Sequence, residues 1–268
     1  MNTKDYLLKK LPETDYVKLT NDLKAIASNK PLIHSITNYV AMNFSANSLL
    51  SIGAAPVMSR APQEVAEMAS YASAVILNLG TLEESSSEAI LLAGKAANSK
   101  KIPVIYDPVA VGATTFRRDF NNKFLKSVHV DVIRANASEV LALGNTHLIT
   151  KGVDSKDKSS DAVEIAKILA KQLKAVVIIS GKTDYVTDGV NIKELCFGDP
   201  LMSKVTAMGC SASGIVGAFC AVNKDYFTAS CNSMALCGLA GELAASKSCG
   251  NGSMMINFLD SLMSLSSF

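Results

Sequence analysis

The stretch AVILNL, residues 74–79, carries no charged side chain and places apolar residues at successive positions. Three later stretches share its β-branched, largely apolar character: PVIYDPV (103–109), VDVIRAN (130–136) and AVVIIS (175–180). Runs of this length and composition predict β-strands. Because the apolar residues are consecutive rather than alternating, both faces of each strand are expected to be buried.

Amphipathic segments lie between these strands, and their spacing is typical of helices. They cover residues 63–71, 83–99, 120–127, 138–143 and 161–173, and an earlier helix over 41–51 is expected to end at Gly53. Alternation of strand and helix predicts an α/β fold with a mostly parallel central sheet, helices on both faces and right-handed crossovers.

The pattern changes after residue 180. DYVTDG and NIKELCFG predict a β-hairpin that turns at Asp188 and Gly189, and residues 205–268 read as helices rich in small side chains. No linker, fixed-period repeat or low-complexity tract interrupts the chain. The sequence therefore predicts a single domain over residues 1–268.

Composition narrows the class of protein. Hydrophobic residues make up 49% of the 268 and charged residues 19%, which allows a sizeable core, and 26 basic against 24 acidic side chains give no reason to expect nucleic acid. The mixed-sign run 151–161 is expected to be a solvated loop. The N-terminus lacks the apolar segment of a signal peptide. The uncharged stretch 205–222 contains three glycines and no leucine, which favours a buried helix over a membrane span.

Six cysteines contain no C-x-x-C pair and sit mostly in apolar or small-residue segments. Free, buried thiols in the reducing cytoplasm explain this better than disulfides or a zinc site.

Polar residues and glycines follow all four predicted strands. Ligands of open α/β sheets bind beyond the carboxyl ends of the strands, so these residues point to one shared site. The alternative is that strands simply end in polar turns. The residues are Asn78, Gly80 and Thr81; Asp107; Arg134, Asn136 and Glu139; and Ser180 to Thr183.

Four of these residues suggest a chemistry, and for three of them a plainer alternative exists. Asp107, held extended by the following proline, suits a magnesium ion or its water shell, or only an Asx turn. Arg134 can clamp a phosphate. Asn136 and Glu139 have the spacing of a capping box at a helix start, which the sequence does not separate from a metal role.

The stretch SGKT at 180–183 is not a P-loop. Val176 stands where that motif requires its first glycine, and a hairpin follows rather than a helix.

The stretch VTAMGCSASGIVGAF, residues 205–219, places Cys210 in the first turn of a predicted helix among small residues. Unpaired N–H groups at such a helix start bind anions and are expected to lower the pKa of a thiol there. Tight helix packing is the alternative. A cysteine nucleophile needs an oriented base. His129 and His147 lie beside predicted turns and His34 has no evident orienting partner, so a thiol hydrolase is disfavoured.

In combination and order, several motifs resemble hydroxyethylthiazole kinase, a family with the ribokinase-like fold. The resemblance spans roughly residues 31–264. The motifs are HSITNYVAMNFSANSLLSIGAAPVMS (34–59), LNLGTL (77–82), DPVAVGAT (107–114), RANASE (134–139), VTDG (186–189) and VTAMGCSAS (205–213).

The resemblance implies a ribokinase-like three-layer sandwich that transfers phosphate from ATP to the primary hydroxyl of 4-methyl-5-(2-hydroxyethyl)thiazole, with Mg²⁺, in thiamine synthesis or salvage. It also implies a cytoplasmic homotrimer with sites between subunits. Carried over by motif, the thiazole would contact Asn38, Met58 and Ala207. ATP would contact Arg134, Asn136, Ser180 and Gly209, and backbone amides from Ala207 to Cys210 would form an anion hole. Asp107 and Glu139 would serve the metal, and Cys210 would stand where relatives of the fold carry an aspartate base.

Two positions depart from the family pattern, since Ala207 and Ala135 stand where glycine is usual. If position 207 needs a positive φ, alanine there lowers the stability of the fold by about 1 kcal/mol. If glycine is usual there only because the substrate comes close to the backbone, the methyl group of alanine makes the pocket smaller. Three alternatives to the thiazole kinase stay open at this point: another small-alcohol kinase of the same fold, an ADP-linked dehydratase, and a non-catalytic binding trimer.

Overall fold

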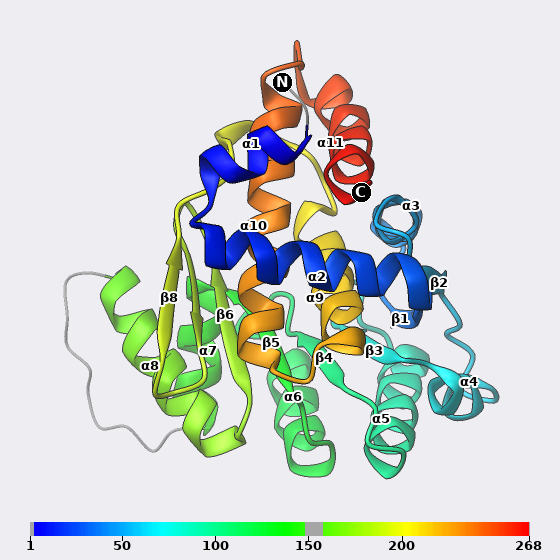
Figure 1. Ribbon diagram of the computed structural model, residues 1–268. Coiled ribbons are helices and arrows are strands. Elements are labelled where there is room, and N and C mark those ends of the chain that lie inside the picture. Colours follow the sequence, from blue (N-terminus) through cyan, green and yellow to red (C-terminus); the bar gives the residue numbers. More distant parts are fainter. Residues whose placement is uncertain (1–2, 148–157, 268) are drawn as a thin grey trace.

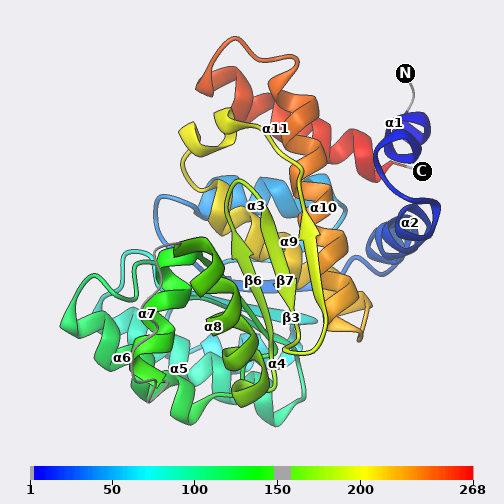
Figure 2. The ribbon, with the colours of Figure 1, turned by 90° about the vertical axis from the view of Figure 1, so that its left-hand side faces the viewer.

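A computed structural model describes residues 3–147 and 158–267 and contains one eight-stranded sheet in the order β2-β1-β3-β4-β5-β6-β7-β8. Strands β1 to β6 run parallel, and β7 and β8 form the predicted antiparallel hairpin at one edge (Figures 1 and 2). The strands are β1 (Leu32–Ile36), β2 (Ala55–Val57), β3 (Ala74–Asn78), β4 (Val104–Asp107), β5 (Val132–Asn136), β6 (Val176–Ser180), β7 (Asp184–Thr187) and β8 (Ile192–Leu195).

Helices cover both faces of the sheet, as Figure 2 shows most clearly. One layer consists of α4 (Val65–Tyr71), α5 (Glu84–Ser99), α6 (Thr115–Ser127), α7 (Ala137–His147) and α8 (Lys158–Leu173). The other contains α1 (Thr3–Lys10), α2 (Glu13–Asn29), α3 (Met42–Ser51), α9 (Met208–Val222), α10 (Tyr226–Ala245) and α11 (Asn251–Ser266), with the short 3₁₀ helix η1 (Pro200–Lys204). The α/β three-layer prediction is confirmed.

The strands are uniformly apolar because helices bury both faces of the sheet. In β3, Ala74 and Ile76 belong to the core on the α9 side, whereas Val75 and Leu77 belong to the core on the α5 side. The other central strands alternate in the same way. Side chains of β3 keep alternating between the two faces beyond Leu77, so the side chain of Asn78 lies on the α9 side of the sheet.

Helix α9 lies close to the sheet because it is rich in small residues. A Cβ built on Gly217 would come 2.2 Å from the Cδ1 atom of Ile76, so any larger residue there would force the Ile76 side chain to move. Residues Ser211 to Cys220 are buried. Tight packing therefore accounts for the middle of the 205–222 stretch, and in the described part of the chain no helix is both long and apolar enough to cross a membrane.

The four central strands and the predicted helices are confirmed, with small shifts at their ends. Strands β1 and β2 and helices α1 and α2 were missed: LIHSI in β1 contains two polar residues, and β2 has only three residues. Residues 158–161 of the mixed-sign run begin α8 rather than a loop, and 151–157 lie outside the described residues. All six cysteines are free, as expected, but the expectation that they are buried holds only for Cys220 and Cys237, because Cys196 and Cys249 are exposed and the other two half-buried.

Candidate active site

The carboxyl ends of β2, β1, β3, β4, β5 and β6 lie side by side at one edge of the sheet, where α9 begins. This order brings together the predicted site residues that follow each strand. Along the row they are Met58, Asn38, Asn78, Asp107, Arg134 and Ser180. Cys210 and Ser213 enter the row from the first two turns of α9.

A chain of hydrogen bonds joins the centre of this row. The Nδ2 group of Asn38 donates to Oδ1 of Asn78 at 3.0 Å, and Nδ2 of Asn78 donates to Oδ2 of Asp107 at 2.7 Å. The hydroxyl of Ser213 donates to the same Asp107 oxygen, also at 2.7 Å. All four side chains are buried. Burial raises the pKa of Asp107, while the positive charge of Arg134 and the two hydrogen bonds oppose that rise.

Cys210 lies beside this chain and accepts from two amides, Nδ2 of Asn38 at 3.2 Å and Nδ2 of Asn78 at 3.4 Å. The expectation of a lowered pKa for this thiol is wrong. Burial, followed by the negative charge of Asp107, raises the pKa of Cys210 and outweighs the two amide donors and Arg134. The side chain is therefore a neutral thiol at pH 7.

Arg134 lies across the N-terminus of α9. Its Nη2 donates to the Ser180 hydroxyl at 2.8 Å, and a Cβ built on Gly209 would come 2.9 Å from Nη1. The absence of a side chain at Gly209 is thus what lets the guanidinium approach the helix start. N–H groups in the first turn of a helix have no intrahelical partner, so the two features together form an anion site.

Asn136 and Glu139 form the capping box that the sequence allowed. The Oδ1 atom of Asn136 accepts from the Glu139 amide at 3.0 Å, and Oε2 of Glu139 accepts from the Asn136 amide at 2.9 Å. Oε1 of Glu139 also accepts from the amide of Ala110, in the loop after β4, at 2.8 Å. The cap therefore holds the Glu139 carboxylate beside the end of β4, which is where Asp107 lies.

The carboxylates of Asp107 and Glu139 fit a magnesium ion better than a metal with an all-protein ligand set. Burial raises the pKa of Glu139, and the negative charge of Asp107 raises it further by a smaller amount, so the two carboxylates interact electrostatically. Among residues 3–147 and 158–267, no three His, Cys, Asp or Glu side chains are grouped to hold a metal. Magnesium usually binds through one or two carboxylates, with waters and phosphate oxygens completing its shell.

Met58 follows the edge strand β2 and is half-buried. The next residue is held by His34, whose Nε2 lies 2.9 Å from the carbonyl oxygen of Ser59. A carbonyl only accepts, so Nε2 carries the proton, and the buried Nδ1 has no hydrogen-bond partner. Burial lowers the pKa of His34. It acts here as a neutral anchor for the Met58 segment, not as the base of a cysteine nucleophile.

Position 207 has the backbone conformation for which glycine is suited. Ala207, the N-cap of α9, has φ 67° and ψ 0°, in the left-handed region. Thr81 and Ala110, in the loops after β3 and β4, also have positive φ, so backbone strain gathers around this site. Ala135 lies buried inside β5 without such a φ. A positive φ therefore explains why glycine is usual in the family at position 207, but it does not explain the usual glycine at position 135.

Replacing Ala207 with glycine is expected to raise the free energy of unfolding by about 0.5–1 kcal/mol, because glycine adopts this conformation without strain. Urea denaturation at constant m-value measures the change. Ala221→Gly, in the right-handed last turn of α9, is the matched control and is expected to lower stability by a similar amount. A less stable Ala207→Gly variant would contradict the strain at this position.

Asn78 is the residue that the sequence analysis undervalued. It was noted as a strand end, but its amide contacts Asn38, Asp107 and Cys210 and accepts from the Gly80 amide at 2.9 Å. Its one sequence signal is a polar residue closing an otherwise apolar strand. Asp184, at the start of β7, was also missed. It accepts from the Gly181 amide at 2.9 Å, and burial raises its pKa to about 6.

Comparison with known proteins gives this geometry its context. A family model described as hydroxyethylthiazole kinase family matches residues 23–267. The chain belongs to the hydroxyethylthiazole kinase family. It is accordingly a kinase that phosphorylates hydroxyethylthiazole, a step of thiamine formation.

Individual relatives agree. A hydroxyethylthiazole kinase from Desulfotalea psychrophila is 47% identical and one from Moorella thermoacetica 46%, each over about nine-tenths of both chains. The solved hydroxyethylthiazole kinase structure from Pyrococcus horikoshii superposes with a TM-score of 0.83 at 32% identity, covering 91% of this chain and 92% of that one.

More distant structures show the fold alone. A ribokinase-like superfamily protein from Enterococcus faecalis has a TM-score of 0.69 at 13% identity, with 92% of this chain and 93% of that chain covered. An NAD(P)H-hydrate dehydratase from Bacillus subtilis has a TM-score of 0.57 at 13% identity, covering 88% and 90%. The kinase fold is thus ribokinase-like.

Proposed function

We propose that hydroxyethylthiazole binds at the β1 and β2 side of the site, with its ring between Asn38 and Met58 and against the methyl of Ala207. The primary hydroxyl then lies beside Cys210. Asn38 supports this placement because its buried amide already faces the sulfur of Cys210. Met58 supplies a flexible apolar surface, and His34 fixes the backbone next to it.

ATP occupies the β5 and β6 side in this proposal. Its γ-phosphate lies at the start of α9, against the amides from Ala207 to Cys210, and Arg134 neutralises phosphate charge. Asn136 and Ser180 contact the rest of the nucleotide. The observation that carries the proposal is the contact of the Arg134 guanidinium with Gly209, because it places a fixed cation at a helix N-terminus one residue before Cys210.

Mg²⁺ is proposed to bind at Asp107 and Glu139 through its waters and phosphate oxygens. The ion would supply charge neutralisation on the transferred phosphate. A Bacillus subtilis neighbour of this fold was crystallised with ATP and Mg²⁺, which supports the assignment by fold only. The capping bonds hold Glu139 in place for this role, and Asn78 and Ser213 hold Asp107.

In the transfer step, the substrate hydroxyl oxygen forms a bond to the γ-phosphorus while the bond to the bridging oxygen of ADP breaks. ADP leaves with that electron pair. The hydroxyl proton is lost late, because phosphoryl transfer passes through a loose transition state that asks little of a base. A neutral Cys210 therefore leaves room for the hydroxyl but does not take its proton, which passes to an oxygen of the transferred phosphoryl group.

Substitutions at Cys210 test this role. Cys210→Asp is expected to keep or raise kcat, and Cys210→Ala to lower it about threefold to tenfold, because proton transfer contributes little here. Steady-state ADP release with hydroxyethylthiazole measures both. Complete loss of activity in both variants, with folding intact by circular dichroism, would show instead that the thiol is obligatory.

We further propose that the kinase is a cytoplasmic homotrimer of single-domain subunits with sites between them. Val40, Leu50 and Met263 expose apolar side chains on the segment before α3, on α3 itself and on α11. Helices α3 and α11 pack against each other, and Val40 lies two residues from Asn38. An apolar face that borders the thiazole side supports subunit contacts there. Solution mass by light scattering tests the trimer.

A further inference from the structure

Two loops continue from the centre of the site. The loop after β3 follows Asn78, and the loop after β4 follows Asp107. Each contains a residue other than glycine with a positive φ, Thr81 at 45° and Ala110 at 55°. Such backbone conformations persist only where the surrounding structure holds them. The groups that hold these two loops therefore decide how firmly Asn78 and Asp107 are placed.

One guanidinium group binds both loops. Nη1 of Arg117, in the first turn of α6, donates to the carbonyl oxygen of Leu79 and to that of Val109, the latter at 2.9 Å. Leu79 directly follows Asn78, and Val109 directly precedes Ala110. Among the residues that the structure describes, no carboxylate lies within 4 Å of the Arg117 guanidinium. The partners of this cation are therefore loop carbonyls and not an acidic side chain.

The place of Arg117 within α6 is unfavourable for the helix itself. The hydroxyl of Thr114, the N-cap, accepts from the Arg117 amide at 3.3 Å, so Arg117 is the third residue of the helix. A cation so close to a helix N-terminus is repelled by the helix dipole. The stabilising contribution of this side chain therefore comes from its contacts with the two loops.

The loop after β4 is also held from its other side. Oε1 of Glu139, in the first turn of α7, accepts from the Ala110 amide at 2.8 Å. Arg117 binds the carbonyl of the preceding residue, Val109. The backbone just beyond Asp107 thus lies between the starts of two helices, and the same guanidinium joins it to the loop after β3.

We propose that Arg117 is a positioning residue of the kinase, which acts through two backbone carbonyls and touches neither substrate. By holding the loop after β3 it keeps Asn78 beside Cys210. By holding the loop after β4 it keeps Asp107 beside Ser213. The inference rests on the proposed function, in which Asp107 serves the metal and Cys210 faces the substrate hydroxyl. The hold on the loops itself does not depend on which ligands bind.

Substitutions at Arg117 test the effect on catalysis. Arg117→Met keeps an apolar stem but removes the donors, and is expected to lower kcat about tenfold to 10²-fold, because small displacements of site residues have effects of this size. Arg117→Lys carries an ammonium that can donate to two carbonyls, and should restore kcat to within about threefold of wild type. Steady-state ADP release with hydroxyethylthiazole measures both.

Exchange of backbone amide hydrogens, followed by mass spectrometry on the ligand-free protein, tests the hold on the loops without using activity. The amides of Leu79 and Ala110 donate hydrogen bonds of 3.0 and 2.8 Å, so each loop contains an amide that reports its opening. Arg117→Met is expected to speed exchange about tenfold or more in peptides that cover 79–82 and 109–113. Arg117→Lys should exchange more slowly than Arg117→Met in both.

The neighbouring residue provides a matched control. Arg118 has the same side chain, but its guanidinium donates to the Gly112 carbonyl and the Thr115 hydroxyl and reaches neither Leu79 nor Val109. Arg118→Met should therefore leave kcat within about twofold of wild type and leave exchange in 79–82 unchanged.

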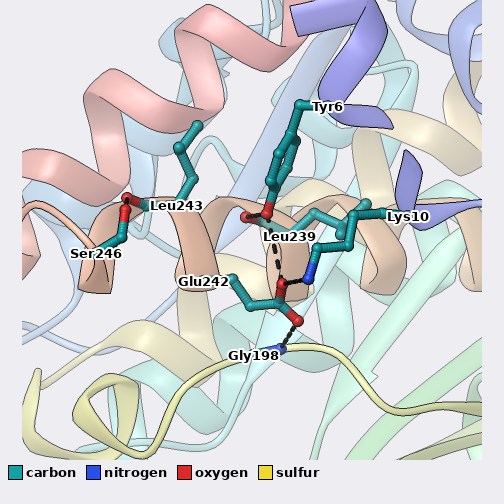
Figure 3. Close-up of polar contacts among 7 residues, drawn as sticks. All are labelled: Tyr6, Lys10, Gly198, Leu239, Glu242, Leu243 and Ser246. Atoms are coloured by element: carbon teal, nitrogen blue, oxygen red, sulfur yellow. Dashed lines mark hydrogen bonds and ion pairs between the residues drawn. The ribbon is translucent and has the colours of Figure 1, made fainter. Parts of the chain in front are cut away.

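A second control removes a cation from a polar cluster that shares no residue with the site (Figure 3). Oε2 of Glu242, on α10, lies 2.5 Å from Nζ of Lys10 and accepts from the Tyr6 hydroxyl at 3.5 Å, while Oε1 accepts from the Gly198 amide at 3.4 Å. This cluster joins α1, α10 and the loop after β8. Lys10→Gln should leave both kcat and the exchange of the two site loops as in wild type.

Wild-type exchange in both loops of Arg117→Met, or a wild-type kcat, would overturn the inference. If Arg117→Met does not fold, Arg117→Gln, which is too short to bind both carbonyls, decides by the same two measurements. If Asp107→Asn keeps its kcat while Arg117→Met opens both loops and slows turnover, the metal assignment fails and the role of Arg117 stands. If Asp107→Asn is inactive while Arg117→Met behaves like wild type, only the role of Arg117 fails.

Discussion

Replacing Asp107 with asparagine is expected to lower kcat on the order of 10³-fold, with the protein still folded. Asparagine keeps the size of the side chain and can still accept the bonds from Asn78 and Ser213, but it removes the negative charge. That charge is the one we assign to the magnesium shell. Steady-state kinetics at saturating ATP and hydroxyethylthiazole measure the loss.

Two further readouts separate a lost charge from a damaged fold. Burial raises the folded-state pKa of Asp107, so in wild type the stability that the protonated form provides is lost as pH rises through that pKa. The neutral variant should therefore be at least as stable as wild type at pH 7–8. The Asp107 charge also raises the pKa of Cys210, so its removal should speed alkylation of Cys210 by iodoacetamide. A kcat within about tenfold of wild type would contradict the assignment.

Replacing Arg134 with alanine is expected to lower kcat/KM for ATP by about 10²–10³-fold, because a fixed guanidinium at the phosphate site is lost. Lysine should restore little of this, since it cannot reproduce the planar donor that reaches Ser180 while lying over Gly209. Initial rates over a range of ATP concentrations measure the effect, and the KM for the thiazole should change much less.

Position and charge can be tested separately at this residue. Gly209→Ala keeps the guanidinium but displaces it, because the new methyl would lie 2.9 Å from Nη1. Ser180→Ala removes one hydrogen bond and should cost only about threefold to tenfold. A Gly209→Ala variant with wild-type kinetics would show that contact between Arg134 and the helix start is unnecessary.

The fold could be predicted well where strands were long and uniformly apolar. Four such runs predicted the centre of the sheet, and their polar ends predicted the edge at which the site lies. The sequence could not show which alternate residues face α9, since both faces of each strand are buried. The face on which each side chain lies places Asn78, Asp107 and Arg134 together on the side of the sheet where α9 begins.

Other features depended on contacts that no local pattern reveals. The pKa of Cys210 was expected to fall because of its place in a helix, but burial and the nearby Asp107 raise it. Asn136 and Glu139 fit two roles by spacing, and the structure shows the cap, which holds the Glu139 carboxylate beside the end of β4, where we propose that the metal binds. Helices α1 and α2 were missed because their segments are rich in charged residues, and α2 is held by packing on α9 and α10 that no local pattern reveals.

The most direct test is ADP release by the purified protein at saturating ATP, with and without 4-methyl-5-(2-hydroxyethyl)thiazole and with and without Mg²⁺. We expect ADP release that requires both the thiazole and the metal, with phosphorus NMR showing the new phosphate on the primary hydroxyl. Folded protein that releases no thiazole-dependent ADP at saturating ATP and Mg²⁺ would contradict the proposed kinase site.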